Sequence, residues 1–130
     1  MSTILFPTDF SDAATRALIY ALQLADRLEA KIITLHVFEK PDISGLIQVP
    51  QNLEEFYNSI DLYEFDNYKD AVPLLDKIKD EQGLNPLSVV HTMHEGDTEE
   101  TILERATAEK ADFIVMGTTG ARGLKEIILG

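Results

Sequence analysis

The chain has 130 residues, 45% of them hydrophobic, with 23 Asp and Glu against 11 Lys and Arg, which gives a formal net charge of −12. This size and composition suit one folded domain and exclude a disordered chain, while the negative charge disfavours nucleic acid and membrane surfaces as partners. With no cysteine, no apolar run near the roughly 20 residues of a membrane span and no secretory signal pattern, we expect a cytoplasmic location.

The first forty residues predict a strand, a helix and a second strand. Residues 4–6 form a short apolar run that Pro7 ends, which is typical of a strand buried on both faces. Ser11 or Asp9 can cap the helix that follows, in which apolar residues recur at helical spacing. Residues 31–38, KIITLHVF, are β-branched and apolar and predict the second strand.

The middle of the chain is the least regular part. Residues 41–66 contain a glycine, two prolines and an acidic, aromatic tail, and we interpret them as a surface insertion packed partly by its own aromatic rings. The alternative is a lid or a partner surface, because loops of this length are often functional. Helical periodicity returns from Tyr68 to Gln82, and Pro73 is tolerated only near the first turn of that helix unless it kinks it.

The last third repeats the alternation. Residues 87–93 predict a third strand, and Asp97 with Glu100 has the spacing of a capping box for a helix that ends near Lys110. Residues 112–116, DFIVM, predict a fourth and uniformly apolar strand.

Strands that alternate with helices predict an α/β fold of three layers, an open parallel sheet with helices on both faces. In such sheets, ligands bind beyond the carboxyl ends of the strands, where the strand order reverses. A common order, 3-2-1-4, puts that reversal between the first and fourth strands. Their carboxyl ends carry residues 7–9 and 117–120, the two most unusual loops of the chain.

The loop after the fourth strand has glycines at positions 117, 120 and 123. Glycines let backbone N–H groups approach an anion closely, and a helix starting after them would point its positive end at the same place. Further donors lie between the glycines: Thr118, Thr119 and Arg122. The alternative is a plain strand-to-helix connection, since the pattern is neither G-x-G-x-x-G nor the lysine-bearing P-loop.

Asp9, in the loop after the first strand, has two roles open to it. It can cap the helix, or it can hydrogen-bond to a ribose, an adenine edge or a water-bound metal.

Four segments, in this order, resemble the universal stress protein family: PTDFS, LHV, EGD and VMGTTG. Gly117, Gly120 and Gly130 match the G-x2-G-x9-G pattern of the ATP-binding branch of this family. The resemblance implies an adenine nucleotide alpha hydrolase-like fold and ATP, with or without Mg²⁺, as ligand. The adenosine would meet residues 7–9 and the backbone of Val37, the ribose would meet Met116 and Gly117, and the later glycines would hold phosphates. The complete expected nucleotide site is Pro7, Thr8, Asp9, Val37, Met116, Gly117, Thr118, Gly120, Arg122, Gly123, Leu129 and Gly130.

The resemblance also implies a departure from the family. Members of that branch continue past the last glycine with a Ser or Thr, a helix and a fifth strand through which many dimerise, whereas this sequence stops at Gly130. We therefore expect one domain over residues 1–130 that is incomplete at its C-terminus and a homodimer in the full-length protein. The expected role is a regulatory, stress-response module that binds ATP. One alternative is a protein-interaction module that uses residues 41–66 and needs no nucleotide. The other is a slow ATPase, in which Asp9 would act as the base.

The histidines do not predict a metal site. His91 and His94 lie three apart on a strand and so point to opposite faces, and His36 is most simply a core or edge residue of the second strand. Three acidic residues predict a solvated surface rather than a calcium loop: Asp61, Glu64 and Asp66.

Overall fold

The computed structural model describes residues 2–41, 51–84 and 88–117. The described elements, in chain order, are β1 (Thr3–Pro7), α1 (Asp12–Leu28), β2 (Lys31–Phe38), α2 (Leu53–Glu81), β3 (Val89–Glu95), α3 (Thr98–Ala108) and β4 (Phe113–Ile114). The strands form one parallel sheet in the order β3-β2-β1-β4. The expected α/β fold and strand order are confirmed, and the strand order reverses between β1 and β4.

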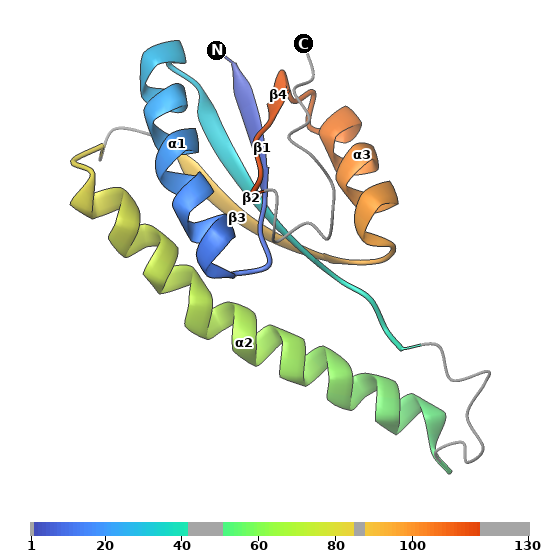
Figure 1. Cartoon of the computed structure of the whole chain (residues 1–130). Helices are drawn as coiled ribbons and strands as arrows, with labels where there is room; N and C mark the ends of the chain where they lie inside the picture. The colour runs from blue at the N-terminus through green and yellow to red at the C-terminus, as the bar shows by residue number, and fades with distance from the viewer. Residues whose placement is uncertain (1, 42–50, 85–87, 118–130) are drawn as a thin grey trace.

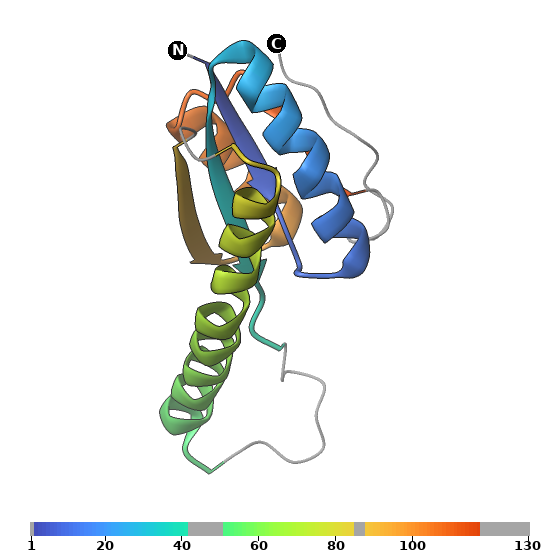
Figure 2. The ribbon, with the colours of Figure 1, turned by 90° about the vertical axis from the view of Figure 1, so that its left-hand side faces the viewer.

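The sheet is covered on both faces. Helices α1 and α2 lie over one face and α3 over the other (Figures 1 and 2). Side chains of a strand alternate between the faces, so Ile4 and Phe6 pack with α1 whereas Leu5 packs with α3. All three are fully buried, and each such side chain stabilises the fold by about 1.5–3 kcal/mol.

Two helices begin at caps that the sequence predicts. Ser11 caps α1, because its hydroxyl accepts a hydrogen bond of 3.2 Å from the N–H of Ala14. Asp97 caps α3 by accepting a 2.9 Å bond from the N–H of Glu100. The choice between Ser11 and Asp9 is therefore settled in favour of Ser11.

Helix α2 corrects the interpretation of residues 41–66. It begins at Leu53, where Asn52 caps it by accepting a 2.9 Å bond from the N–H of Glu55, so residues 53–66 are helical rather than irregular. The predicted start at Tyr68 is wrong for the same reason. Residues 42–50 lie outside the described residues. Apolar residues do recur at helical spacing at the start of this segment, from Leu53 through Phe56 and Tyr57 to Ile60, although no residue from 53 to 66 is buried. The interpretation as an irregular insertion overlooked this pattern.

Pro73 lies in the interior of α2, not in its first turn. A proline inside a helix removes one backbone hydrogen bond and crowds the carbonyl four residues earlier, which costs about 3 kcal/mol. Pro73 is exposed, and its neighbour Leu75 is the buried residue of α2. The packing of Leu75 against the α1 face of the core helps to offset this cost.

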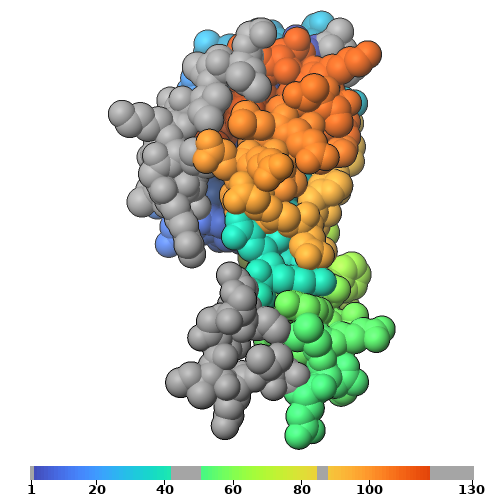
Figure 3. Space-filling view, turned by 90° about the vertical axis from the view of Figure 1, so that its right-hand side faces the viewer, coloured from blue at the N-terminus to red at the C-terminus, as the bar shows by residue number. Residues whose placement is uncertain are grey.

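The first half of α2 projects beyond the carboxyl edge of the sheet. We call residues 53–66 the α2 arm. Figure 1 shows the arm extending past the ends of the strands, and in Figure 3 it lies below the surface that α3 contributes. Large apolar side chains are exposed along it: Leu53, Leu62, Tyr63 and Phe65. The arm therefore gains little stability from apolar burial, and polar contacts must hold it.

The remaining differences lie at the ends of elements. Strand β3 runs over Val89–Glu95 rather than residues 87–93, of which residue 87 lies outside the described residues. Strand β4 is two residues long rather than five, since it pairs with β1 only through Phe113 and Ile114. None of the described helices combines the length and apolar composition of a membrane span.

Candidate functional site

The segments that follow β1 and β4 lie beside each other at the carboxyl edge of the sheet. β1 and β4 are hydrogen-bonded neighbours, and the N–H of Val115 still donates to the carbonyl of Leu5 at 3.0 Å. Beyond it, a Cβ added to Gly117 would lie 2.9 Å from the backbone oxygen of Ala13, in the first turn of α1. Glycine is thus required for the segment after β4 to rest against the start of α1.

The loop after β1 is held by its own side chains. The N–H of Phe10 donates to the hydroxyl of Thr8 at 3.0 Å, and the N–H of Ser11 donates to Asp9 Oδ1 at 2.9 Å. Phe10 has a φ of 63°, a left-handed conformation that bulky residues rarely adopt. Asp9 is exposed, so the carboxylate both holds the turn and faces solvent at the site.

Val37 lies in the part of β2 that extends beyond the end of β1. The pairing of β1 with β2 ends at Pro7 and Leu35, whereas β2 continues beside β3 to Phe38. Backbone groups alternate between the two sides of a strand, and those of Leu35 face β1, since its carbonyl accepts from Thr8 at 2.9 Å. The N–H and C=O of Val37 therefore face the same side, beyond the last residue of β1.

The structure thus places five of the residues predicted for the nucleotide site close together. Pro7, Thr8 and Asp9 follow one strand, and Met116 and Gly117 follow its neighbour. Val37 lies one strand away, on β2. Pro7, Thr8 and Met116 are buried, as expected of residues that form the base of a binding site at this edge. The other predicted residues lie outside the described part of the chain: Thr118, Gly120, Arg122, Gly123, Leu129 and Gly130.

His36 is a residue of this edge that the sequence did not predict. Its Nδ1 lies 3.0 Å from the backbone oxygen of Thr8, and its Nε2 lies 3.3 Å from a carboxylate oxygen of Glu64 on α2. The centre of its ring lies 4.8 Å from that of Phe10, with the two ring planes tilted by 37°. The position next to Val37 was the only sequence signal for this role, because a lone histidine in a strand carries no motif.

Lys40 ties the α2 arm to the ends of β2 and β3. Its ammonium lies 3.4 Å from a carboxylate oxygen of Asp61, 3.3 Å from Glu95 and 5.2 Å from the ring centre of Tyr57. Desolvation acts to lower the pKa of Lys40, but the hydrogen bonds and charges of Glu95 and Asp61 outweigh it and raise the pKa. Two of the three residues expected to form a solvated acidic surface, Asp61 and Glu64, are instead paired with cationic groups or histidine.

Tyr68, a residue of α2, and His91, a residue of β3, make further contacts between α2 and the rest of the domain. Burial raises the pKa of the Tyr68 phenol, whose ring lies 6.3 Å from that of Phe10. His91 bridges Thr34 Oγ1 at 2.8 Å and Asp76 Oδ1 at 2.9 Å. Within residues 2–41, 51–84 and 88–117, no three His, Cys, Asp or Glu residues are placed to hold a metal ion.

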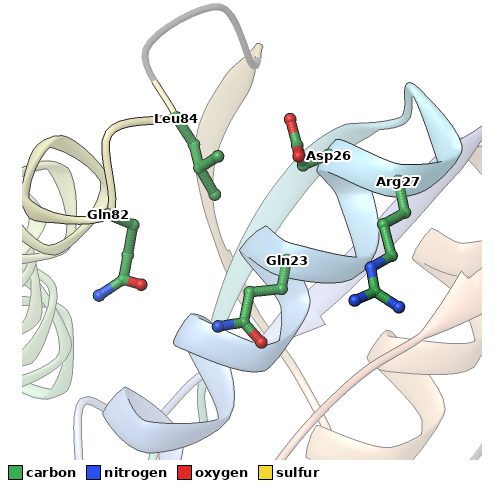
Figure 4. A pocket seen from close by; sticks show the side chains of 5 residues that line it. All are labelled: Gln23, Asp26, Arg27, Gln82 and Leu84. Atoms are coloured by element: carbon green, nitrogen blue, oxygen red, sulfur yellow. The ribbon is translucent and has the colours of Figure 1, made fainter.

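An open hollow of about 340 Å³ lies between the second half of α1 and the turn after α2. Figure 4 shows the side chains that line it: Gln23, Asp26, Arg27, Gln82 and Leu84. Because these helices lead into β2 and β3, the hollow lies at the amino ends of those strands. It is therefore separate from the carboxyl edge that carries Asp9 and Gly117.

Comparison with known proteins identifies the family. The model of the universal stress protein family matches residues 1–130. Universal stress protein MJ0531 of Methanocaldococcus jannaschii is 34% identical over 128 residues, which cover 98% of this chain and 70% of that protein. The solved structure of MJ0577 from the same organism is 31% identical, covers 99% of this chain and 83% of its own, and has a TM-score of 0.72.

Two further relatives share the fold and were solved with adenine nucleotides. A universal stress protein in complex with cAMP is 23% identical with a TM-score of 0.61, over 93% of this chain and 79% of that chain. A family member from Arabidopsis thaliana with AMP bound is 15% identical with a TM-score of 0.56, over 88% of this chain and 74% of that chain. By the match of its whole length, the chain described here belongs to the universal stress protein family.

Proposed function

We propose that the chain binds an adenine nucleotide, ATP in the first place, at the carboxyl edge of the sheet between the loop after β1 and the segment after β4. One observation carries the proposal: the strand order reverses between β1 and β4, and Asp9 and Gly117 follow these two strands. Ligands of open parallel sheets bind at such a reversal. The cAMP and AMP held by relatives of the same fold support this class of ligand.

The adenine would meet the backbone of Val37. Its N–H and C=O offer a donor and an acceptor beyond the end of β1, and adenine presents an amino donor beside a ring-nitrogen acceptor. A contact of this kind selects adenine over guanine without a charged side chain. Burial of the base against Pro7 and Thr8 would add the apolar part of the binding free energy.

The ribose would meet Asp9, whose exposed carboxylate is a suitable acceptor for a sugar hydroxyl. The phosphates would meet the glycine-rich residues 117–130 of the sequence, through backbone N–H groups. Because the net charge of −12 repels an anion, such local donors must supply the phosphate affinity. Mg²⁺ would accompany ATP by reducing that repulsion. In the cell, nucleotide occupancy would make the domain a regulatory module of the stress response.

Isothermal titration of the protein with ATP and Mg²⁺ tests the proposal, and we expect saturable binding of one nucleotide per chain. Asp9→Ala should weaken binding about tenfold, the usual loss for a hydrogen bond to a charged group. Asp9→Asn keeps an oxygen for the N–H of Ser11 and separates loss of the turn from loss of charge. Asp26→Ala, in the distant hollow, is the control and should bind normally. Absence of binding heat when the unsubstituted protein is titrated with ATP and Mg²⁺ would contradict the proposal.

A second function, binding of a partner protein through the α2 arm, is favoured by the exposure of Leu62 and Phe65 on a projecting helix, at 65% and 51%. Exposed apolar residues that lie three apart on a helix suit insertion into an apolar groove. Replacing both with serine should abolish partner capture and leave ATP binding intact. Unchanged capture by the double variant would count against this role.

A further inference from the structure

The α2 arm exposes three large apolar side chains within about one turn of the helix. Leu62, Tyr63 and Phe65 are each more than half exposed. The contacts that hold the arm leave from its other side, toward the end of β2. Figures 1 and 2 show that, apart from the end of β2, no described helix or strand lies beside the arm. The three side chains therefore form an unpartnered surface, which we call the arm face.

Asp66 lies in the middle of the arm face. It follows Leu62 by four positions and Tyr63 by three, and side chains at these spacings are neighbours on the surface of a helix. The Asp66 side chain is exposed, and among the residues that the structure describes it makes no ion pair. Any surface that covers the arm face must therefore take the Asp66 carboxylate out of water.

This carboxylate restricts what can cover the arm face. A carboxylate that leaves water without a cationic partner is costly, which excludes a purely apolar covering surface. A second copy joined by a twofold axis would set one arm against the other, and the charged residues of the arm are all acidic: Glu54, Glu55, Asp61, Glu64 and Asp66. An anionic lipid surface is repelled by the same charges. The arm face therefore requires a partner that combines apolar side chains with Lys or Arg.

The helical backbone of the arm determines the form of that partner. The backbone groups along a helix are bonded within it, so a partner can contact only its side chains. A second helix does this well, because apolar side chains three and four positions apart on each helix fit between one another. Lys and Arg suit the border of such a contact, since their long apolar stems cover the partner while the charge reaches a carboxylate.

We propose that the arm face docks a basic amphipathic helix of a partner protein, and that Asp66 selects the cation of that helix. The proposal rests on the second function given above for the arm and is independent of the nucleotide site. Lys69 and Asp70 occupy the next turn and balance each other in charge, so Asp66 determines the charge preference of the arm face.

Three labelled peptides of about 18 residues, long enough to form a helix, test the proposal. The first has Leu and Lys at the spacing of an amphipathic helix, the second has Glu in place of Lys, and the third has the residues of the first in an order that leaves no apolar face. Fluorescence anisotropy in about 0.15 M salt, which screens distant charges, measures their binding to the whole chain. We expect saturable binding of one Leu–Lys peptide per chain and about tenfold weaker binding of the other two, because each lacks one of the two required features.

The apolar part of the contact is tested by replacing Leu62 and Phe65 together with serine. Binding of the Leu–Lys peptide should weaken about thirtyfold, the loss typical of a side chain that dominates an interface. The matched control replaces Tyr20 of α1 and Leu103 of α3 with serine, since these side chains are also exposed, at 61% and 44%. The control should bind the Leu–Lys peptide normally.

The charge preference is tested by reversing one charge. Asp66→Lys should bind the Leu–Glu peptide about tenfold more tightly than the Leu–Lys peptide, because the cation now lies on the arm face and repels the former partner. Glu104→Lys makes the same change in net charge at an exposed position of α3 and should keep the preference of the unsubstituted protein.

The proposal is overturned if Glu104→Lys changes the preference as much as Asp66→Lys does, because net charge alone would then explain the binding. Normal binding by the double serine variant at Leu62 and Phe65 overturns it as well. Sedimentation that shows a dimer of the unsubstituted protein, lost in that double variant, would assign the arm face to a second copy instead. If none of the three peptides binds, the second function fails together with the proposal, whereas the ATP titration of the unsubstituted protein decides the nucleotide site separately.

Discussion

Gly117 marks the point at which the segment after β4 meets the start of α1. A Cβ there would lie 2.9 Å from the oxygen and 3.0 Å from the carbon of the Ala13 carbonyl, and 3.1 Å from the nitrogen of Ala14. These are backbone atoms of a capped first turn, so they cannot move aside without disturbing the hydrogen bond of Ser11. The absence of a side chain at this position thus sets how closely the two loops of the edge approach.

Gly117→Ala should lower the free energy of unfolding by about 1–3 kcal/mol, the usual cost of overpacking, and should weaken ATP binding. Urea denaturation and calorimetry measure the two effects. Gly83→Ala is the matched control, since its φ of +69° adds about 1–2 kcal/mol of strain but its Cβ meets nothing within 4 Å. It should destabilise the protein without affecting the nucleotide. Normal stability and normal ATP affinity of Gly117→Ala would refute the role given to this glycine.

Among the elements, α1, α3 and the strand order could be predicted from the sequence, because helix caps and buried strands have recognisable local sequence patterns. Ser11 and Asp97 have side chains that cap the N-terminus of a helix by accepting a backbone hydrogen bond, and the buried strands are short apolar runs. The α2 arm could not be predicted in this way. Its apolar residues recur at helical spacing only over the short stretch from Leu53 to Ile60. The pairs of Lys40 with Asp61 and of His36 with Glu64 join residues more than twenty positions apart, and such contacts have no signal in the local sequence.

At the edge itself, the sequence predicted the residues that follow β1 and β4 from topology alone. It could not predict His36, because its role depends on the register that places Pro7 opposite Leu35 and leaves the next residues of β2 unpaired on that side. The same register places Val37 for backbone contacts, although in the sequence only the resemblance to a family indicated that residue.

Lys40→Met should loosen the α2 arm, because Lys40 pairs with Asp61 of the arm and with Glu95 at the end of β3. We expect amide hydrogen exchange in residues 53–66 to become about threefold faster, in line with the modest strength of exposed ion pairs. Residues 67–81, which include buried Leu75, should keep their exchange rates. Lys69→Met, at an exposed position on the same helix, is the control and should change neither segment.

The same contact has a defined pH dependence. The folded pKa of Lys40 is raised above its ordinary value of 10.5, so its contribution is fully present below that value and is lost as the pH rises through the higher folded pKa. Arm exchange that is as slow in Lys40→Met as in the unsubstituted protein would contradict this account of the arm.

In the molecule as a whole, the residues that stabilise the fold and the residues of the proposed binding site lie in different parts of the sheet. The two apolar clusters fill the faces of the sheet, under α1 with α2 and under α3. The carboxyl edge instead carries a strained Phe10, an exposed Asp9 and His36, which contacts Thr8 and Glu64. Strained and polar groups are typical of functional sites, and here they lie at the edge that we propose as the nucleotide site, while the apolar layers on either side offset their cost.

The central claim is that an adenine nucleotide binds at this edge, and an NMR titration of the ¹⁵N-labelled protein with ATP and Mg²⁺ tests it most directly. We predict saturable changes in the backbone amides of the loop after β1, of Val37 and of Met116 and Gly117, with little change around Gln23 and Arg27 of the distant hollow. Spectra that do not change with ATP, or changes confined to the hollow or to the α2 arm, would contradict the claim.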